Sequence, residues 1–456
     1  MTQTNYDTGR PYPALKGRRL RNFMARIRNS TDFFSELHSR AGEAGLIEYS
    51  VLGQRFVVIF DTEMIEEVMV RRHHQFNKGK VYKRVLENPT IITGDGDDHR
   101  RRRKLYQPAF SSKARKGYHP HIVEEAKAVW DGLREGEVID VDHTSHELML
   151  NIANKTFFGG DAEIEARLLK ESLDTITWIS IIGHLPFHKF FKALPLPGNI
   201  RYRRVLRELE VKISEVVKKA RETSEERSDL VSWLATATDE EGVDNPFTEE
   251  EIRDEVHMLL LAGHETSASM LTWCLYYLSR DPERREKMER EVDEVLGGRL
   301  PELEDIDRLV YTRAVFDEAL RLSPPVAYLG RQPIEDVTIN DYFIPRDTVV
   351  HLAVRIPMRQ EEWFYDPDEF IPERWLEEPQ PRRPRYAYAP FGGGARLCSG
   401  LILAAMEIVS SLAIFAQRWR VEPISAEFPK VTDVVLYKVK HGLPVRVSAR
   451  PDTGPA

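Results

Sequence analysis

The sequence is poor in cysteine and has no apolar segment at its start. Its 456 residues include 2 cysteines, Cys274 and Cys398, which are too few and too far apart for a secreted disulfide framework. The N-terminal segment Met1–Asn29 has no apolar core of a signal peptide, and it lacks the roughly 20 apolar residues of a membrane span. The sequence therefore predicts a cytoplasmic chain without a membrane span, in a reducing compartment.

An excess of positive charge is also missing. The formal net charge is −8, which gives no reason to propose nucleic acid as a partner. The apolar fraction of 41% is ordinary for a chain that buries a large core. The basic stretch Lys16–Asn29 has apolar residues between its charges; a solvated first helix is the favoured interpretation, and a helix lying on a membrane surface is the alternative.

Helical patterns dominate the middle of the chain, and β patterns lie towards both ends. Thr248 caps a helix expected from about Glu249 to Arg280, which is long enough to cross the molecule as a central spine. Its apolar stretch Met258–Leu278 imitates a membrane span, but the acidic Glu265 at its centre favours a buried helix of a globular protein. We predict one domain over residues 1–456, mainly α with a smaller β region (α+β), with the helical body at about 99–300, 301–330 and 400–418 and the β region at about 46–60, 337–354 and 434–447.

A glycine-rich segment surrounds Cys398. It reads Phe391-Gly-Gly-Gly-Ala-Arg396-Leu-Cys398-Ser-Gly400. Glycines permit a turn with little bulk, so a sulfur can approach a flat cofactor while backbone N–H groups face it. The helix expected from about Leu401 points its N-terminus at the sulfur and favours negative charge there. A buried structural cysteine is the alternative, but the full pattern Phe-x-x-Gly-x-Arg-x-Cys-x-Gly is more specific than a cysteine among glycines.

The long helix carries a polar motif, Ala262-Gly263-His264-Glu265-Thr266-Ser267. The hydroxyl of Thr266 can bond to a carbonyl one turn back and loosen the helix, while Gly263 lets a ligand approach the backbone. A hydroxyl beside a carboxylate suits controlled proton delivery. A polar patch on a core helix is the alternative for this motif alone.

Charged residues at helical spacing occur in two further segments. Glu318 and Arg321 can pair on one helix face, and Arg374 can complete the cluster. His99 and Arg103 share a face of a helix that includes the cationic run Arg100–Lys104. Five consecutive cations cannot all face one ligand, so the remaining ones are expected on the surface, where an acidic protein partner can dock; a solvated or nucleic-acid-binding run is the alternative.

The cysteine segment resembles the haem-binding loop of the cytochrome P450 superfamily, and the other segments follow in that family's order over roughly Phe56–Arg450. The resemblance implies the cytochrome P450 fold, with the long helix over haem b and Cys398 as the ligand of the haem iron. It also implies that Phe391 packs on the thiolate side, that Ala262 and Gly263 lie against the distal face of the haem, and that Glu265 and Thr266 act in dioxygen activation. The residues that it implies for the haem propionates are His99, Arg103, Arg331 and Arg396. The structural triad that it implies consists of Glu318, Arg321 and Arg374.

The implied activity is that of a bacterial monooxygenase, which inserts one oxygen atom of O2 into a lipophilic small molecule. Fatty acid, terpenoid and steroid substrates stay open. Two electrons are expected from a separate ferredoxin and ferredoxin reductase, and the chain is expected to be a monomer. The substrate pocket is expected in the Leu86–Ile92 and Trp178–Leu196 segments and at Ala262, Val326, Ala327, Leu329 and Leu436.

Two other functions are open on the same resemblance. One is a haem-thiolate peroxygenase, isomerase or dehydratase, and the other is a non-catalytic haem protein that senses or carries a ligand. Neither needs the pair Glu265 and Thr266, so the pair favours the monooxygenase. The sequence departs from the family pattern at Met358-Arg359-Gln360, where His-Arg-Asp is usual, and at Asn340-Asp341, where the usual turn glycine is missing.

Overall fold

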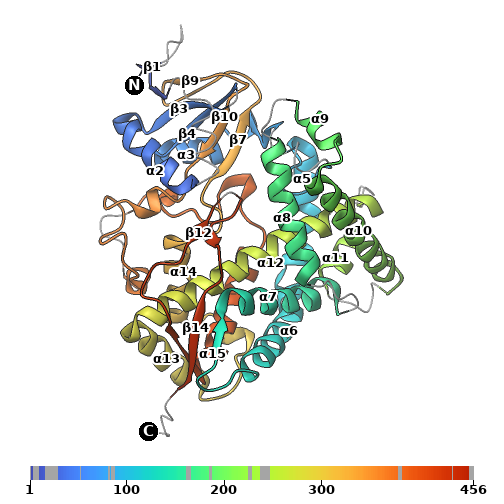
Figure 1. Cartoon of the computed structure of the whole chain (residues 1–456), viewed down its shortest axis with the longest axis vertical. Coiled ribbons are helices and arrows are strands. Elements are labelled where there is room, and N and C mark those ends of the chain that lie inside the picture. Colours follow the sequence, from blue (N-terminus) through green and yellow to red (C-terminus); the bar gives the residue numbers. More distant parts are fainter. Residues whose placement is uncertain are drawn as a thin grey trace.

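The computed structural model describes residues 2–3, 10–15, 29–51, 53–80, 83, 88–160, 166–183, 187–223, 229–236, 247–377, 383–433 and 435–450. Several predictions fall outside these residues. They concern the basic stretch at 16–28, the part of the expected pocket at 86–87 and 184–186, and the start of the strand expected at 434. In the described part, a sheet-rich layer lies at one end of a larger body of helices (Figure 1).

The larger sheet combines strands from distant parts of the chain. The β region expected at about 46–60 is a hairpin: β3 (Leu46–Val51) and β4 (Gln54–Ile59) pair antiparallel, because apolar residues line both runs and Gly53 turns between them. β4 pairs in parallel with β10 (Val349–Leu352), so residues almost 300 positions apart meet in one core. The full strand order is β1 (Thr2–Gln3), β2 (Pro13–Leu15), β3, β4, β10, β7 (Leu329–Pro333) and β5 (Phe76–Asn77).

The β region expected at about 337–354 begins with a hairpin of two short strands. β8 (Val337–Ile339) pairs with β9 (Tyr342–Ile344), and the turn residues Asn340 and Asp341 have φ angles of 43° and 67°. Asn and Asp tolerate this left-handed region better than most residues, so they replace the glycine expected at the turn.

The C-terminal strands do not extend the larger sheet. β11 (Trp419–Pro423) and β14 (Pro444–Ala449) form a separate sheet with β6 (Val138–Asp140), at the other end of the molecule (Figure 1). A two-stranded ribbon of β12 (Val431–Thr432) and β13 (Lys438–Val439) precedes β14. An apolar pattern predicts that a strand is half buried but does not name its partner, so the pairing with β6 could not be predicted.

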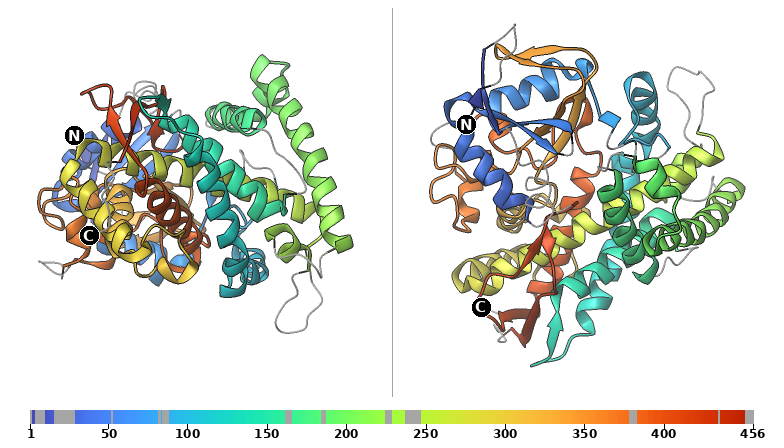
Figure 2. Two further views of the ribbon diagram at one scale, coloured as in Figure 1. Left: turned by 90° about the horizontal axis from the view of Figure 1, so that it is seen from below. Right: turned by 45° about the horizontal axis from the view of Figure 1, so that its top comes forward.

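The long helix α12 begins and ends where the sequence predicted, at Glu249 and Arg280. Thr248 and Glu251 form a reciprocal capping box, which fixes the start of the helix. Figures 1 and 2 show α12, in yellow-green, crossing the helical body. Most of its side chains from Met258 onward are buried, because α7, α14 and α15 pack around it.

The other helices surround α12 or cover the sheet. Among the described residues, no helix is long and apolar enough to span a membrane. The main helices are α2 (Ser30–Ala41), α3 (Thr62–Glu66), α5 (Gly96–Tyr106), α6 (Ser112–Asp131), α7 (Val141–Phe158), α8 (Ala166–Gly183), α9 (His188–Ala193), α10 (Pro197–Thr223), α11 (Leu230–Thr236), α13 (Pro282–Leu296), α14 (Val310–Leu322) and α15 (Leu401–Ala416).

Candidate active site

The glycine-rich loop before α15 has the turns that its sequence predicts. Gly392 and Gly394 have φ angles of 71° and 61°, a region that favours glycine. A Cβ atom on Gly394 would collide with the carbonyl oxygen of Met69, so the loop lies directly on the chain after α3. The backbone N–H of Cys398 donates to the carbonyl oxygen of Phe391 at 3.1 Å, which closes the loop.

Cys398 is exposed, and protein atoms nevertheless surround its thiol. The side chain is exposed to solvent-sized molecules, yet desolvation raises the pKa of its thiol. The exposed side chain is therefore surrounded by enough protein to disfavour its thiolate. A hydrogen bond from the backbone of Gly400 and the charge of Arg103 act in the opposite direction and lower that pKa. The sulfur is therefore placed to accept an electrophilic partner such as a metal, with donors ready to stabilise its thiolate.

Positive charge collects beside this loop. The guanidinium of Arg103 donates at 2.6 Å both to the carbonyl oxygen of Leu397 and to the hydroxyl of Ser399. His99, one turn earlier on α5, is buried, and its pKa is lowered to about 4 by desolvation and by the charges of Arg396, Arg103 and Lys78. His99 is therefore neutral at pH 7 and can donate or accept a hydrogen bond without adding charge.

Arg331, Arg396 and Lys78 form the rest of the cluster. Burial and the charges of both arginines lower the pKa of Lys78 well below its ordinary value. Asp95 opposes this effect; it pairs with Arg396 at 2.9 Å, and Arg396 also donates to the carbonyl oxygen of Gly94 at 2.6 Å. Positive charge exceeds negative charge among these described residues, and the carboxylates of a bound group would relieve the repulsion. The sequence did not single out Lys78, because a lone lysine in a loop carries no pattern.

The polar motif of α12 holds three partly accessible residues in a mostly buried stretch of the helix. Ala262, Gly263 and Thr266 are partly accessible, whereas the residues around them are buried. The hydroxyl of Thr266 donates to the carbonyl oxygen of Ala262 at 2.7 Å, as predicted. Gly263 has a second reason to be small, since a Cβ atom there would lie 3.0 Å from Cζ of Phe157 on α7. Close packing of the two helices therefore disfavours a larger residue at this position.

The carboxyl of Glu265 is buried and held by two groups from outside α12. Its Oε2 atom lies 2.9 Å from Nζ of Lys438 on β13 and 3.3 Å from Nε2 of His146 on α7. Desolvation opposes ionisation, but these two groups outweigh it and bring the pKa of Glu265 to about 2. Glu265 is therefore a carboxylate at rest and not a reservoir of protons. His146 and Lys438 were not predicted, because they lie more than 100 residues away from Glu265 in the sequence and belong to no motif.

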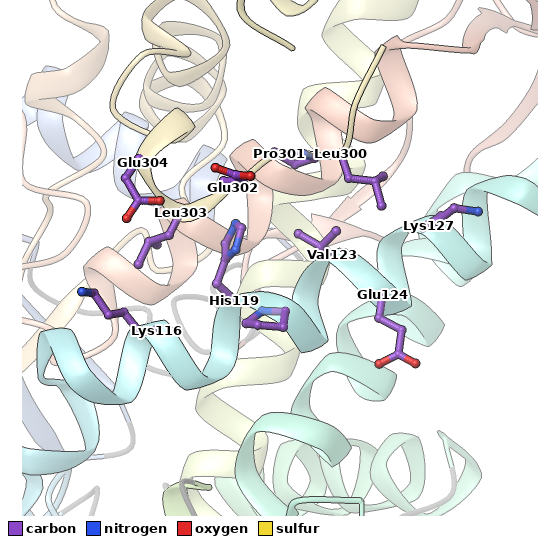
Figure 3. Close-up of a pocket in the computed structure, with 11 residues that line it drawn as sticks. Lys116, His119, Val123, Glu124, Lys127, Leu300, Pro301, Glu302, Leu303 and Glu304 are labelled. Atoms are coloured by element: carbon purple, nitrogen blue, oxygen red, sulfur yellow. The ribbon is translucent and has the colours of Figure 1, made fainter. Parts of the chain in front are cut away.

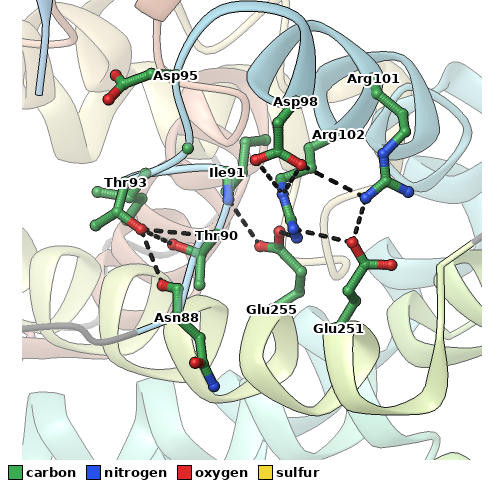
Figure 4. Close-up of polar contacts among 12 residues, drawn as sticks. Asn88, Thr90, Ile91, Thr93, Asp95, Asp98, Arg101, Arg102, Glu251 and Glu255 are labelled. Carbon is green, nitrogen blue, oxygen red and sulfur yellow. Dashed lines mark hydrogen bonds and ion pairs between the residues drawn. The ribbon is translucent and has the colours of Figure 1, made fainter. Parts of the chain in front are cut away.

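The cationic run on α5 differs from the prediction that its remaining residues lie on the surface. Arg102 is 3% exposed and contacts Glu255 at 2.7 Å and Glu251 at 3.0 Å. Arg101 also contacts Glu251, and Figure 4 shows both arginines directed from α5 onto α12. Glu255 also accepts from the backbone of Ile91, which ties the 88–95 loop to the same network. The acidic first turns of α12 bury these cations, and in this run only Arg100 is exposed.

Glu318, Arg321 and Arg374 form one buried cluster. Arg321 binds both carboxylate oxygens of Glu318, at 2.8 and 2.9 Å, and Arg374 contacts the same carboxylate at 2.9 Å. Arg321 also donates to the carbonyl oxygen of Met358 at 2.8 Å. Because that contact uses the backbone, the unusual side chains of the Met358-Arg359-Gln360 segment do not disturb it.

The residues expected to line a substrate pocket come together in part. The backbone N–H of Tyr437 donates to the carbonyl oxygen of Pro325 at 2.8 Å, and Ser269 of α12 donates to the carbonyl oxygen of Tyr437 at 3.2 Å. These bonds join α12 to the segments that hold the remaining expected residues. Among those, Val326, Leu329 and Leu436 are half-buried and Ala327 is buried.

A separate surface pocket of about 620 Å³ lies between α6 and the 300–304 segment (Figure 3). His119 and Val123 line it from α6, and Leu300 and Glu304 from the other side. None of the predicted site residues lines it, so we assign it no part in the reaction.

Comparisons with known proteins agree with this architecture. The family model described as Cytochrome P450 matches residues 22–442. The cyclooctat-9-en-7-ol 5-monooxygenase of Streptomyces melanosporofaciens is 30% identical over 397 residues, which cover 85% of each chain. Pentalenene oxygenase of Streptomyces avermitilis is 30% identical over 394 residues, covering 85% of this chain and 86% of that protein. The cytochrome P450DA heme domain has a TM-score of 0.83 at 23% identity, covering 97% of this chain and 98% of that chain, which shows the fold alone.

The fold, with its long central helix and cysteine-bearing loop, and the family model together define the class of the protein. The chain belongs to the cytochrome P450 family, and it is an oxidoreductase of the monooxygenase type. The predicted fold class and family are confirmed. The residues present fit the haem that the family implies, since an accessible, desolvated thiol lies beside a cluster with surplus positive charge.

Proposed function

We propose that this enzyme hydroxylates a lipophilic small molecule of the terpenoid class. The observation that supports this proposal most strongly is that the same chain holds an exposed Cys398 in the glycine-rich loop and the pair Thr266 and Glu265 on the long helix. The names of two relatives, which act on cyclooctat-9-en-7-ol and pentalenene, favour a terpenoid over the fatty acid and steroid alternatives. The apolar character of Val326, Ala327, Leu329 and Leu436 suits such a substrate.

In this proposal Cys398 ligates the iron of haem b, and His99, Arg103, Arg331, Arg396 and Lys78 surround its propionates. Haem supplies the oxidising chemistry when it is bound, and the protein provides orientation, protons and exclusion of water. The backbone donor of Gly400 and the N-terminus of α15 stabilise the thiolate. Phe391 would pack on the thiolate side of the haem, and Ala262 and Gly263 would lie against its other face.

The hydroxyl of Thr266 is the proposed hydrogen-bonding group nearest to the reacting atoms. Its bond to the carbonyl oxygen of Ala262 leaves the oxygen lone pairs free to accept a further hydrogen bond. Glu265 follows it in sequence and carries negative charge at rest. A proton that reaches Thr266 must therefore first reach Glu265 from another group.

The electron source is proposed to be a ferredoxin with its reductase. Arg101 and Arg102 form ion pairs with carboxylates of α12. The docking surface for such an acidic partner must therefore use other cations, and Arg100 is one that is exposed. A cytoplasmic location and a monomeric state remain predictions.

The test begins with purified protein reconstituted with haem. Its reduced form under carbon monoxide should show the absorption band characteristic of thiolate ligation, and Cys398→Ala should lose that band. Terpenoid hydrocarbons and alcohols are then screened by the shift of the Soret band to shorter wavelength. Turnover with NADPH, a surrogate ferredoxin and its reductase should consume O2 and yield a hydroxylated product. Product formation with peroxide alone would favour the peroxygenase, and ligand binding without turnover would favour the carrier.

A further inference from the structure

The imidazole of His146 connects the surface of α7 to the carboxyl of Glu265. Its Nδ1 atom is 2.6 Å from the backbone carbonyl oxygen of Asp142, and its Nε2 atom is 3.3 Å from Oε2 of Glu265. A carbonyl oxygen can only accept, so Nδ1 carries a hydrogen. A lone pair on Nε2 would repel a lone pair on Oε2 of the carboxylate. Either Nε2 therefore carries a second hydrogen, or the carboxyl of Glu265 is protonated. One exchangeable proton therefore lies between His146 and Glu265.

The surrounding charges decide which of the two residues holds this proton. Lys438 donates to the same Oε2 atom at 2.9 Å and favours the carboxylate. Asp142 places its carboxylate 3.8 Å from Nδ1 and favours the imidazolium. His264 donates from Nε2 to the carbonyl oxygen of His146 at 3.0 Å; burial lowers its pKa to about 4, so it is neutral and adds no charge. The resting pair is an imidazolium and a carboxylate, and the pKa of His146 is correspondingly raised.

Access to water differs between the partners. The side chain of His146 is 19% exposed, whereas that of Glu265 is 4% exposed. Water therefore reaches the imidazole directly, and it reaches the carboxyl much less readily. A proton that travels from solvent to Glu265, and from there towards Thr266, can therefore pass through His146.

We propose that His146 is the positioning residue of Glu265 and the group that supplies its proton during turnover. This inference rests on the proposed role of Glu265 in the monooxygenase reaction. The proton passes from Nε2 of His146 to Oε2 of Glu265, which converts the charged pair into a neutral imidazole and a neutral carboxyl. Glu265 releases the proton towards Thr266 and is a carboxylate again, and His146 regains a proton from water. Each cycle thus moves one proton inward and restores both charges.

The first test needs no turnover. The histidines of the full-length holoprotein are labelled with ¹⁵N and titrated by NMR between about pH 5 and 9 in the diamagnetic ferrous carbon monoxide complex. His146, assigned from the spectrum of His146→Gln, should titrate above 6.5, and Glu265→Gln should lower its pKa by about one unit or more. His143 is the internal control, since it lies on the same helix, is 68% exposed and pairs with Glu147. An imidazole of His146 that titrates at or below 6.5 and ignores Glu265→Gln would overturn the proposal.

The second test separates positioning from proton supply. His146→Arg keeps a cation beside Glu265 but cannot release its proton, whereas His146→Gln keeps only a hydrogen-bond donor. Both should lower kcat by roughly 100-fold and increase the share of electrons lost as peroxide, while KM changes little. The matched control His143→Gln should behave like the wild type. Wild-type turnover in His146→Arg would overturn the supply role.

The carbon monoxide spectrum of each sample distinguishes this failure from failure of the proposed function. If the thiolate band is absent, the proposed function fails whatever His146 does. If the band is present and His146 does not respond to Glu265, only the present inference fails. Should His146→Gln not fold, His146→Arg provides the assignment, and the titration of the wild type against Glu265→Gln requires no other variant.

Discussion

The hydroxyl of Ser267 donates to Oε2 of Glu407 at 2.7 Å, which links the helix after the cysteine loop to the residue following Thr266. Both side chains are buried. Burial raises the pKa of Glu407 to about 7, and the bond from Ser267 only partly offsets this effect. The contact thus joins the two sides of the proposed active site through a carboxyl that is largely protonated below neutral pH.

Replacing Glu407 by glutamine should therefore stabilise the protein in alkaline solution. The folded state holds its proton up to about pH 7, whereas an unfolded glutamate loses it near 4.5, so stability falls as pH rises between these values. Glutamine keeps an acceptor for Ser267 and removes this loss. We expect Glu407→Gln to raise the free energy of unfolding by about 2–3 kcal/mol at pH 8 and to leave it unchanged below pH 4.5. Denaturant unfolding at several pH values measures this, with the exposed Glu427→Gln as control; equal stability of wild type and Glu407→Gln at pH 8 would contradict it.

The close approach of Gly263 and Phe157 predicts that a larger residue at position 263 lowers the stability of the fold. In Gly263→Ala the new methyl would lie 3.0 Å from Cζ and 3.3 Å from Cε2 of Phe157. Overpacking costs about 1–3 kcal/mol, and the better helix propensity of alanine returns about 1 kcal/mol. We expect a net loss of about 1 kcal/mol in Gly263→Ala. Since Phe157→Leu removes the colliding atoms, the double variant should be more stable than Phe157→Leu alone. If Gly263→Ala lowers the free energy of unfolding equally in the wild type and in the Phe157→Leu variant, the ring of Phe157 is not the cause of the loss.

How far the sequence predicts this protein can be seen along α12. Its start, its end and the bond from Thr266 to Ala262 follow from local signals, namely a capping box, an apolar run and a hydroxyl one turn after a carbonyl. The partners of Glu265 do not follow, because His146 and Lys438 reach it only through tertiary packing. The same limit explains the error about Arg101 and Arg102. A run of cations indicates a charged helix face, but the acidic residues that bury it start about 150 positions later, at Glu251.

Arg102 should accordingly contribute to stability and not to partner docking. It is 3% exposed and its guanidinium contacts Glu251, Glu255 and Asp98, so removing it leaves the fully buried Glu255 without its main cation. Breaking one partner of a buried ion pair costs about 3–5 kcal/mol. We expect Arg102→Met to lower the free energy of unfolding by about 3–5 kcal/mol. Arg100 is exposed, so Arg100→Met should change it by less than about 0.5 kcal/mol. Thermal and denaturant unfolding report the difference. A stable Arg102→Met protein with weaker, salt-dependent ferredoxin binding would show that the original surface interpretation was right.

Lys438 and His146 share one oxygen of Glu265, and this arrangement predicts how acid weakens the fold. A carboxyl with a lowered pKa contributes stability that is complete above its unfolded value of 4.5 and is lost as the pH falls towards about 2. Removing Lys438 takes away one of the two cations, so Lys438→Met should raise the pKa of Glu265 and move the acid unfolding midpoint upward. A double-mutant cycle of Lys438→Met with Glu265→Gln at pH 6 should give a coupling energy of about 1–3 kcal/mol, which shrinks between pH 4.5 and 2. The exposed Lys440→Met is the control on the same strand end. Because His146 still contacts the carboxylate, the coupling with Lys438 alone must stay below the total effect of Glu265→Gln; a coupling near zero at pH 6 would mean that Lys438 does not hold Glu265 in solution.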